Sequence, residues 1–232
     1  MSIAENLKQV RERIELAARH AGRDSASVEL MAVTKTQPAE RIREAYEAGQ
    51  RLFGENRVQE FAGKAEALRD LSGAEWRLIG HLQSNKASKA AELFAGVDSV
   101  DSVRLAEKLD AAAQTAGKTL NVLIEVNVGG EAAKAGVAPQ AAELERLLEG
   151  MAKLSSLKVR GLMTVPPFAA DPEESRSHFR SLRELRDEVA GRLTGVSLTT
   201  LSMGMSHDCE VAIEEGSTCV RVGTAIFGER QK

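Results

Sequence analysis

The sequence predicts an α/β protein built as a closed (β/α)8 barrel of the TIM type, with an extra helix before the first strand. Eight short apolar segments of strand character occur along the chain, and a segment of helical periodicity separates each consecutive pair. Strict alternation implies a parallel sheet, and eight units are the number that closes a barrel. The alternative is a doubly wound open sheet, but no GxGxxG sequence follows the first strand. We expect a single domain over residues 1–232, with the first helix within 1–24 and the barrel over 28–229.

The first helix is expected over residues 3–19, where apolar residues recur at alternating spacings of four and three. Such a helix can cover either the bottom of a barrel or its side. The predicted strands are short runs rich in Val, Ile and Leu, bounded by turn-forming residues. They cover residues 28–35, 51–56, 75–81, 96–102, 120–128, 157–165, 196–206 and 219–228.

The helices between these strands are predicted from their apolar stripes and their end signals. Pro38 opens the first of them, and Gly117 ends the fourth. Phe179, Leu182 and Leu185 lie on the inward face of the longest. The predicted helices cover residues 38–50, 57–70, 84–94, 103–117, 139–154, 172–193 and 208–216.

Composition excludes several classes of protein. A net charge of −3 and a pI near 5.9 argue against a nucleic-acid binder. The N-terminal segment is charged and amphipathic, and no apolar run approaches transmembrane length, so we expect a soluble, cytoplasmic protein without membrane contact. The two cysteines, Cys209 and Cys219, do not form a CxxC motif, and we expect no metal site.

Polar residues and glycines cluster where the predicted strands end. In barrels of this type the chemistry is at the C-terminal ends of the strands. Any one of these residues alone is more simply the start of a loop, but the set at one rim predicts a functional site. In chain order the residues are Lys35, Glu55, Asn56, His81, Asp101, Asn127, Met163, Thr164, Ser202, Met203, Gly204, Arg221, Val222, Gly223 and Thr224.

The last two strands predict a phosphate site. Barrels often bind phosphate with the loops after strands 7 and 8 and a short helix N-terminus. Hydroxyls of Ser202, Ser206 and Thr224 lie in these loops, and Gly204 and Gly223 allow backbone N–H groups to approach an anion. The alternative is a tight turn in which Ser206 caps the short helix.

Lys35 follows an apolar strand, where a desolvated ammonium is unfavourable unless it has a partner or a chemical role. Strands 1 and 8 are neighbours in a barrel, so Lys35 is expected close to the phosphate site. Beside Arg221 its pKa would fall, which makes it a competent amine nucleophile. An amine near a phosphate site suggests a Schiff base with a phosphorylated aldehyde such as pyridoxal phosphate (PLP). A phosphosugar aldolase is one alternative, and a lysine paired with Glu55 or Asp101 is another.

Six motifs in order strongly resemble the pyridoxal phosphate homeostasis protein family. They are AVTKTQP, GENRVQE, GHLQSNK, GLMT, LSMGMSHD and VRVGTAIFG, and the resemblance covers the chain from about residue 28 to residue 229. The family is a single-domain barrel of PLP fold type III, similar to the N-terminal domain of bacterial alanine racemases and to the barrel of eukaryotic ornithine decarboxylases. The resemblance implies that the chain binds PLP and takes part in intracellular vitamin B6 homeostasis.

The resemblance also implies roles for individual residues. Lys35 would hold PLP as a Schiff base, and Arg221 would face the pyridine nitrogen. The remaining cofactor-binding residues would be Asn56 near the ring, His81, Met163, and Ser202, Gly204, Gly223 and Thr224 around the phosphate. No role is transferred to His207, which stands at a position expected to vary.

Three features predict a carrier without an evident catalytic reaction. A racemase needs a second acid/base, which in alanine racemases is a tyrosine from another domain, and the only tyrosine here, Tyr46, lies in a predicted outer helix. The sequence ends at residue 232, soon after the last strand, so we expect one face of the cofactor to be open to water. Arg221 would disfavour protonation of the pyridine nitrogen and weaken its electron sink.

Two enzymatic alternatives remain at this level. One is a PLP-dependent racemase that uses His81 or His207 as base, and the other is a barrel lyase whose lysine works without a cofactor. PLP-dependent apo-enzymes are candidate recipients of the cofactor, and the chain is expected to be a monomer because no long apolar stripe is left over. Lys134 is a possible second amine near the rim, but a solvated loop lysine is the simpler interpretation.

Overall fold

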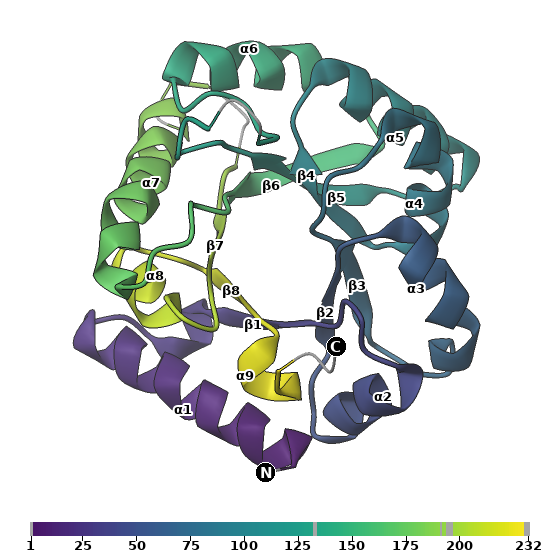
Figure 1. Ribbon diagram of the computed structural model, residues 1–232. Helices are drawn as coiled ribbons and strands as arrows, with labels where there is room; N and C mark the ends of the chain where they lie inside the picture. Colours follow the sequence, from purple (N-terminus) through teal and green to yellow (C-terminus); the bar gives the residue numbers. More distant parts are fainter. Residues whose placement is uncertain (1, 132–133, 191, 194–196, 230–232) are drawn as a thin grey trace.

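The computed structural model describes residues 2–131, 134–190, 192–193 and 197–229, and the predicted (β/α)8 barrel is present in them. Eight parallel strands pair in sequence order and the last pairs with the first, which closes the sheet (Figure 1). That the whole chain is a single domain stays a prediction. The strands are β1 (Glu29–Val33), β2 (Leu52–Glu55), β3 (Glu75–Leu78), β4 (Gly96–Val100), β5 (Leu120–Glu125), β6 (Leu157–Met163), β7 (Thr200–Met205) and β8 (Cys219–Val222).

One helix packs outside the sheet between each pair of consecutive strands. Two predicted positions lie outside the described residues. They are residue 191, within the predicted helix 172–193, and residue 196, the first residue of the predicted strand 196–206. These helices are α2 (Ala39–Glu47), α3 (Val58–Ala65), α4 (Ala87–Leu93), α5 (Val103–Thr115), α6 (Ala141–Met151), α7 (Arg176–Ala190) and α8 (Cys209–Glu214). Short 3-10 turns cover Ser25–Ser27, Glu66–Leu68, Ser84–Lys86 and Pro172–Ser175.

The extra helix α1 (Ile3–His20) packs on the side of the barrel, against α8 and α2 (Figure 1). It takes the place in the outer ring that a long helix after β8 would fill. Ser2 and Glu5 start it with a capping box, and its buried stripe includes Leu7, Val10 and Ile14. The sequence allowed this helix to cover either the bottom or the side of the barrel, and in the structure it covers the side.

The predicted last strand was too long. β8 ends at Val222, and Thr224–Phe227 form the short helix α9. Periodicity alone does not distinguish a strand from a helix in so short an apolar run. Tertiary contacts favour the helix, because Ile226 and Phe227 are buried and Asn6 of α1 donates a hydrogen bond of 2.8 Å to the Ile226 carbonyl.

Glu215, at the end of α8, ties that helix to α7. Its side chain is only 6% exposed, and its carboxylate accepts hydrogen bonds from Arg176 at 3.2 Å, Arg180 at 2.9 Å and Arg183 at 3.0 Å. The hydrogen bond from Arg180 is the largest of the causes that lower the pKa of Glu215.

No helix in the described part of the chain is long and apolar enough to cross a bilayer.

Replacing Glu215→Gln should lower the free energy of unfolding at pH 7 by about 2–3 kcal/mol, because three guanidinium groups lose a shared anion. The pKa of Glu215 is lowered by folding, so its contribution is present above the unfolded value of about 4.3 and disappears as the pH falls through the folded value. Urea unfolding at pH 7 and near pH 3 measures both effects. The control is Glu173→Gln, an exposed partner of Arg176, which should change the free energy of unfolding much less than Glu215→Gln does. An equal loss at both pH values would contradict this account of Glu215.

Candidate functional site

The turn after β1 presents Lys35 at the C-terminal end of the barrel. Lys35 is half-buried, and the next residue, Thr36, has φ 64°, a left-handed conformation that strains a β-branched residue. A small cavity connects this turn with the start of α9. Its lining residues are Val33, Lys35, Thr36, Gln37, Gly223, Thr224 and Gly228. Lys35 therefore lies beside the Gly223–Thr224 turn, at the seam where β1 meets β8.

The loop after β7 contacts α9 directly, because the Ser206 hydroxyl accepts a hydrogen bond of 3.3 Å from the Ala225 N–H. Ser206 does not cap α8, whose N-cap is Asp208. Arg13 of α1 holds the same loop from outside. Its guanidinium donates to the Ser206 carbonyl at 3.0 Å and to both carboxylate oxygens of Glu210 at 2.6 and 2.9 Å. The two loops expected to bind phosphate are thus joined to each other and anchored on α1.

Gly204, near the end of β7, has a backbone role just before this loop. Its φ is +90°, and a Cβ at this position would lie 2.5 Å from the Cβ of Ala212. Glycine is therefore required both by the backbone conformation and by the close packing of α8 on β7.

Arg221 points into the barrel and is 3% exposed. It donates to the Ser202 hydroxyl at 2.8 Å and to the Thr164 carbonyl at 2.7 Å. Burial is the main cause that lowers the pKa of Arg221, and the nearby carboxylates of Asp98 and Glu125 oppose it. Ser202 is fully buried, so its hydroxyl orients the guanidinium from within the barrel. This geometry suits a supporting role for Ser202 better than a direct phosphate contact.

The remaining predicted residues surround the barrel mouth. Asn56 follows β2, and its backbone is so close to Gly80 that a Cβ on Gly80 would lie 2.1 Å from the Asn56 carbonyl. His81 is 57% exposed, with its Nδ1 3.8 Å from a carboxylate oxygen of Asp101. Met163 is fully buried at the end of β6.

Two loop residues are held by local contacts. Lys134 forms an ion pair of 2.8 Å with Glu131, which agrees with a loop lysine in a surface pair. His207 lies 3.0 Å from the Ala170 carbonyl through its Nε2.

Sequence reasoning missed two buried groups near this rim. Glu125, at the end of β5, has a carboxylate oxygen, Oε2, with no hydrogen-bond partner among the described residues, and burial raises its pKa. Lys64 of α3 lies against the Lys35 turn and pairs with Glu55 at 2.8 Å. Glu125 had a signal in the sequence, as a carboxylate at the end of an apolar strand. Lys64 had none, because it follows an ordinary amphipathic pattern.

The two cysteines are buried, free thiols. Burial raises the pKa of both Cys209 and Cys219 to about 12. Within the residues that the structure describes, no three His, Cys, Asp or Glu side chains gather as a metal site.

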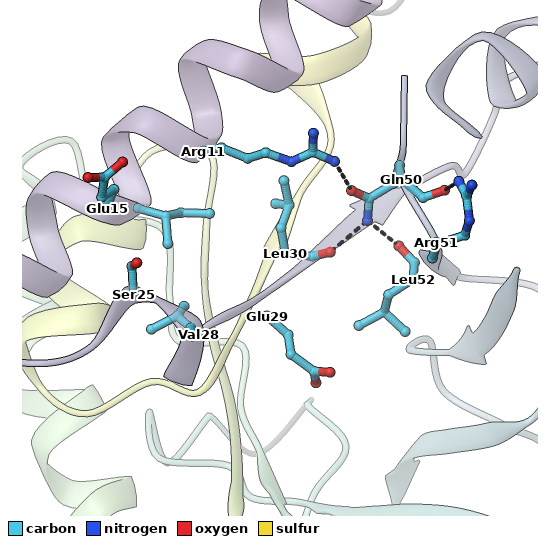
Figure 2. A pocket seen from close by; sticks show the side chains of 11 residues that line it. Arg11, Glu15, Ser25, Val28, Glu29, Leu30, Gln50, Arg51 and Leu52 are labelled. Atoms are coloured by element: carbon cyan, nitrogen blue, oxygen red, sulfur yellow. Dashed lines mark hydrogen bonds between the residues drawn. The ribbon is translucent and has the colours of Figure 1, made fainter. Parts of the chain in front are cut away.

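A larger hollow of about 490 Å³ lies at the opposite, N-terminal end of β1 and β2, against α1 (Figure 2). Figure 2 shows the Gln50 carboxamide donating to the Leu30 and Leu52 carbonyls at 2.6 and 2.7 Å and accepting from Arg11. None of the predicted site residues lines it. The Gln50 side chain is bound by groups of the hollow itself, and the candidate site is therefore sought at the C-terminal rim.

The family model described as alanine racemase, N-terminal domain, matches residues 6–231. A pyridoxal phosphate homeostasis protein of Aquifex aeolicus is 49% identical over 231 residues, with 100% of each chain covered. The chain belongs to the pyridoxal phosphate homeostasis protein family. A protein of the same name from Escherichia coli is 45% identical over 98% of this chain and 97% of its own length.

Solved structures agree with this family assignment. PipY of Synechococcus elongatus, in a structure with PLP bound, matches with a TM-score of 0.85 and 41% identity over 98% of this chain and 100% of that chain. An alanine racemase of Clostridium difficile matches with a TM-score of 0.72 over 98% of this chain and 58% of that chain. At 15% identity the racemase shows only that the fold is shared.

Replacing Gly204→Ala should destabilise the protein by about 2–4 kcal/mol, because the added methyl group meets Ala212 and the positive φ disfavours a side chain. Thermal unfolding measures the change. The matched control is Gly63→Ala in α3, where nothing lies within 4 Å of the place the added methyl group would take and a gain of up to about 1 kcal/mol is expected. Equal effects of the two substitutions would contradict the packing role of Gly204.

Proposed function

We propose that this protein binds PLP through a Schiff base on Lys35 and takes part in PLP homeostasis in the cytoplasm, without a catalytic reaction of its own. One observation carries the proposal. The Lys35 turn and the Gly223–Thr224 turn line the same cavity at the mouth of the barrel. An amine and a pair of backbone N–H groups beside a hydroxyl are the groups that recognise a phosphorylated aldehyde.

The groups around this cavity fit the cofactor in chemical type. The cofactor supplies an aldehyde, with which a neutral amine condenses as water leaves. The Thr224 hydroxyl and the backbone of Gly223 would bind the phosphate, with Ser206 beside them through its contact to α9. Gly204 would shape the neighbouring loop, as its packing on α8 indicates.

The ring would lie over the barrel interior. Arg221 would face it from below, with its guanidinium fixed by Ser202 and the Thr164 carbonyl. Asn56, His81 and Met163 would border the ring from the ends of β2, β3 and β6. Two hydrogen bonds fix the position of the Arg221 guanidinium. A guanidinium also keeps its charge, so it presents a positive charge and no removable proton at that side.

The chain's own residues support a carrier over a racemase. The only tyrosine in the sequence, Tyr46, lies in α2 and donates its hydroxyl to the Ser72 carbonyl at 2.7 Å, outside the barrel. His81 is largely exposed and faces Asp101. A buried arginine disfavours a protonated pyridine nitrogen, which an efficient electron sink requires. A half-buried Lys35 and a largely exposed His81 suit exchange of the cofactor, and PLP-dependent apo-enzymes are the proposed recipients. We further propose that the protein acts as a monomer.

Wild-type protein mixed with PLP should develop the near-violet absorbance of a Schiff base, and Lys35→Ala should not. Borohydride reduction and peptide mapping should locate the adduct on Lys35. Lys89→Ala removes an exposed lysine that pairs with Glu92, and as the control it should bind like wild type. An absent wild-type band would overturn PLP binding and favour a lysine that works without a cofactor. A band that persists in Lys35→Ala would move the attachment to another amine.

The PLP-loaded protein should exchange the α-hydrogen of alanine in D₂O no faster than the same concentration of free PLP. The physical reason is the missing second acid/base together with the charge of Arg221. NMR of the alanine α-proton measures the exchange, and an alanine racemase serves as positive control. Protein-dependent exchange that falls in His81→Gln would instead establish the racemase-like alternative.

A further inference from the structure

The backbone that carries Lys35 is held in a strained shape. Thr36 is the only non-glycine residue with positive φ in the part of the chain that the structure describes. Left-handed conformations of β-branched residues cost free energy and persist only where surrounding contacts fix them. The contacts that fix this turn come from α3, outside the barrel, and from the end of β2.

Lys64 of α3 supplies two of these contacts. Its ammonium donates to the Thr34 carbonyl at 3.0 Å and to the Gln37 carbonyl at 3.2 Å, so it binds the backbone on both sides of Lys35. The Lys64 side chain is only 11% exposed. The three N–H donors of the Lys64 ammonium are therefore used by acceptors of the protein itself and not by a ligand.

Two carboxylates complete the support. Glu60 lies 3.3 Å from the Lys64 ammonium and accepts a hydrogen bond from the backbone N–H of Thr36, the strained residue. Glu55 lies 2.8 Å from the same ammonium and accepts from the Thr34 hydroxyl. The turn is thus bound at two carbonyls, one amide and one hydroxyl, and Lys64 connects all of these contacts.

We propose that Lys64 is a positioning residue for Lys35. By fixing the turn Thr34–Gln37 it sets the direction in which the Lys35 side chain leaves the backbone, and so the approach of the amine to the aldehyde. The inference rests on the proposed function. In the bond-forming step the Lys35 nitrogen attacks the aldehyde carbon, the C=N bond forms and the aldehyde oxygen leaves as water. Lys64 takes no part in these bond changes.

The test compares wild type, Lys64→Met, Lys64→Arg and Lys118→Met. Methionine keeps a linear side chain without the charge, and arginine keeps the charge with a different shape. Lys118 is the matched control, because it also donates to backbone carbonyls, those of Phe94 at 2.8 Å and Glu92 at 3.4 Å, on the outer layer away from the Lys35 turn. Three quantities are measured: the rate of Schiff-base formation with PLP, the induced circular dichroism per bound cofactor at saturation, and the melting temperature without cofactor.

Lys64→Met should slow Schiff-base formation about tenfold or more, as expected for a misplaced reacting group, and should change the induced circular dichroism. Lys64→Arg should restore part of both signals. Lys118→Met should keep the wild-type rate and spectrum whatever its melting temperature, which separates positioning of the amine from loss of stability.

A wild-type rate and spectrum in Lys64→Met would overturn the inference, and so would an equal slowing by Lys118→Met. If Lys64→Met does not fold, Lys64→Arg decides: a lower rate with altered dichroism supports positioning, and wild-type values overturn it. Failure of the proposed function is recognised separately, because wild type itself would then show no band that depends on Lys35.

Discussion

The pairing of β1 with β8 is the constraint on which the rest of the structure depends. In this pair Met31 lies opposite Arg221 and Ala32 opposite Val222. The register places the turn after β1 beside the turn after β8, so Lys35 and Gly223 share one cavity although they are far apart in the sequence. Closure also removes the sheet edges that an open arrangement would expose. Helix α1 covers the outside of this seam, where Arg13 binds the loop after β7 and Asn6 binds α9.

The interior of the barrel is more highly charged than the branched aliphatic filling usual for this fold. Arg77 and Asp98 form a buried ion pair of 2.6 Å, and Arg221 lies nearer the mouth with Ser202 and the Thr164 carbonyl. Isolated buried charges are unfavourable, so each of these groups needs its partners. The result is a rigid cation below the proposed ring position. A separate set of charges around Lys64 binds the Lys35 turn from the helix layer.

Much of the architecture was predictable from the sequence, because regular alternation of strands and helices leaves few topologies. The closeness of Lys35 to the Gly223–Thr224 turn followed from that topology alone. Helix α9 did not, because its apolar run fits either secondary structure until contacts with α1 decide. The orientation of Ser202 and Arg221 into the barrel required the strand register. Glu55 pairs with Lys64 of the helix layer, a contact that only the inward or outward direction of each β2 residue could reveal.

The same seam has a consequence for how the protein is made. Synthesis delivers β1 early and β8 late, and a parallel pair so distant in sequence forms slowly because a long loop must close first. A nascent chain therefore carries Lys35 after a strand that still lacks its final neighbour and the Gly223–Thr224 turn. Capacity to sequester a cofactor arises in one step, when the last strand docks. Unfinished chains would lack the proposed site, so the cofactor bound at that site would report the number of completed barrels.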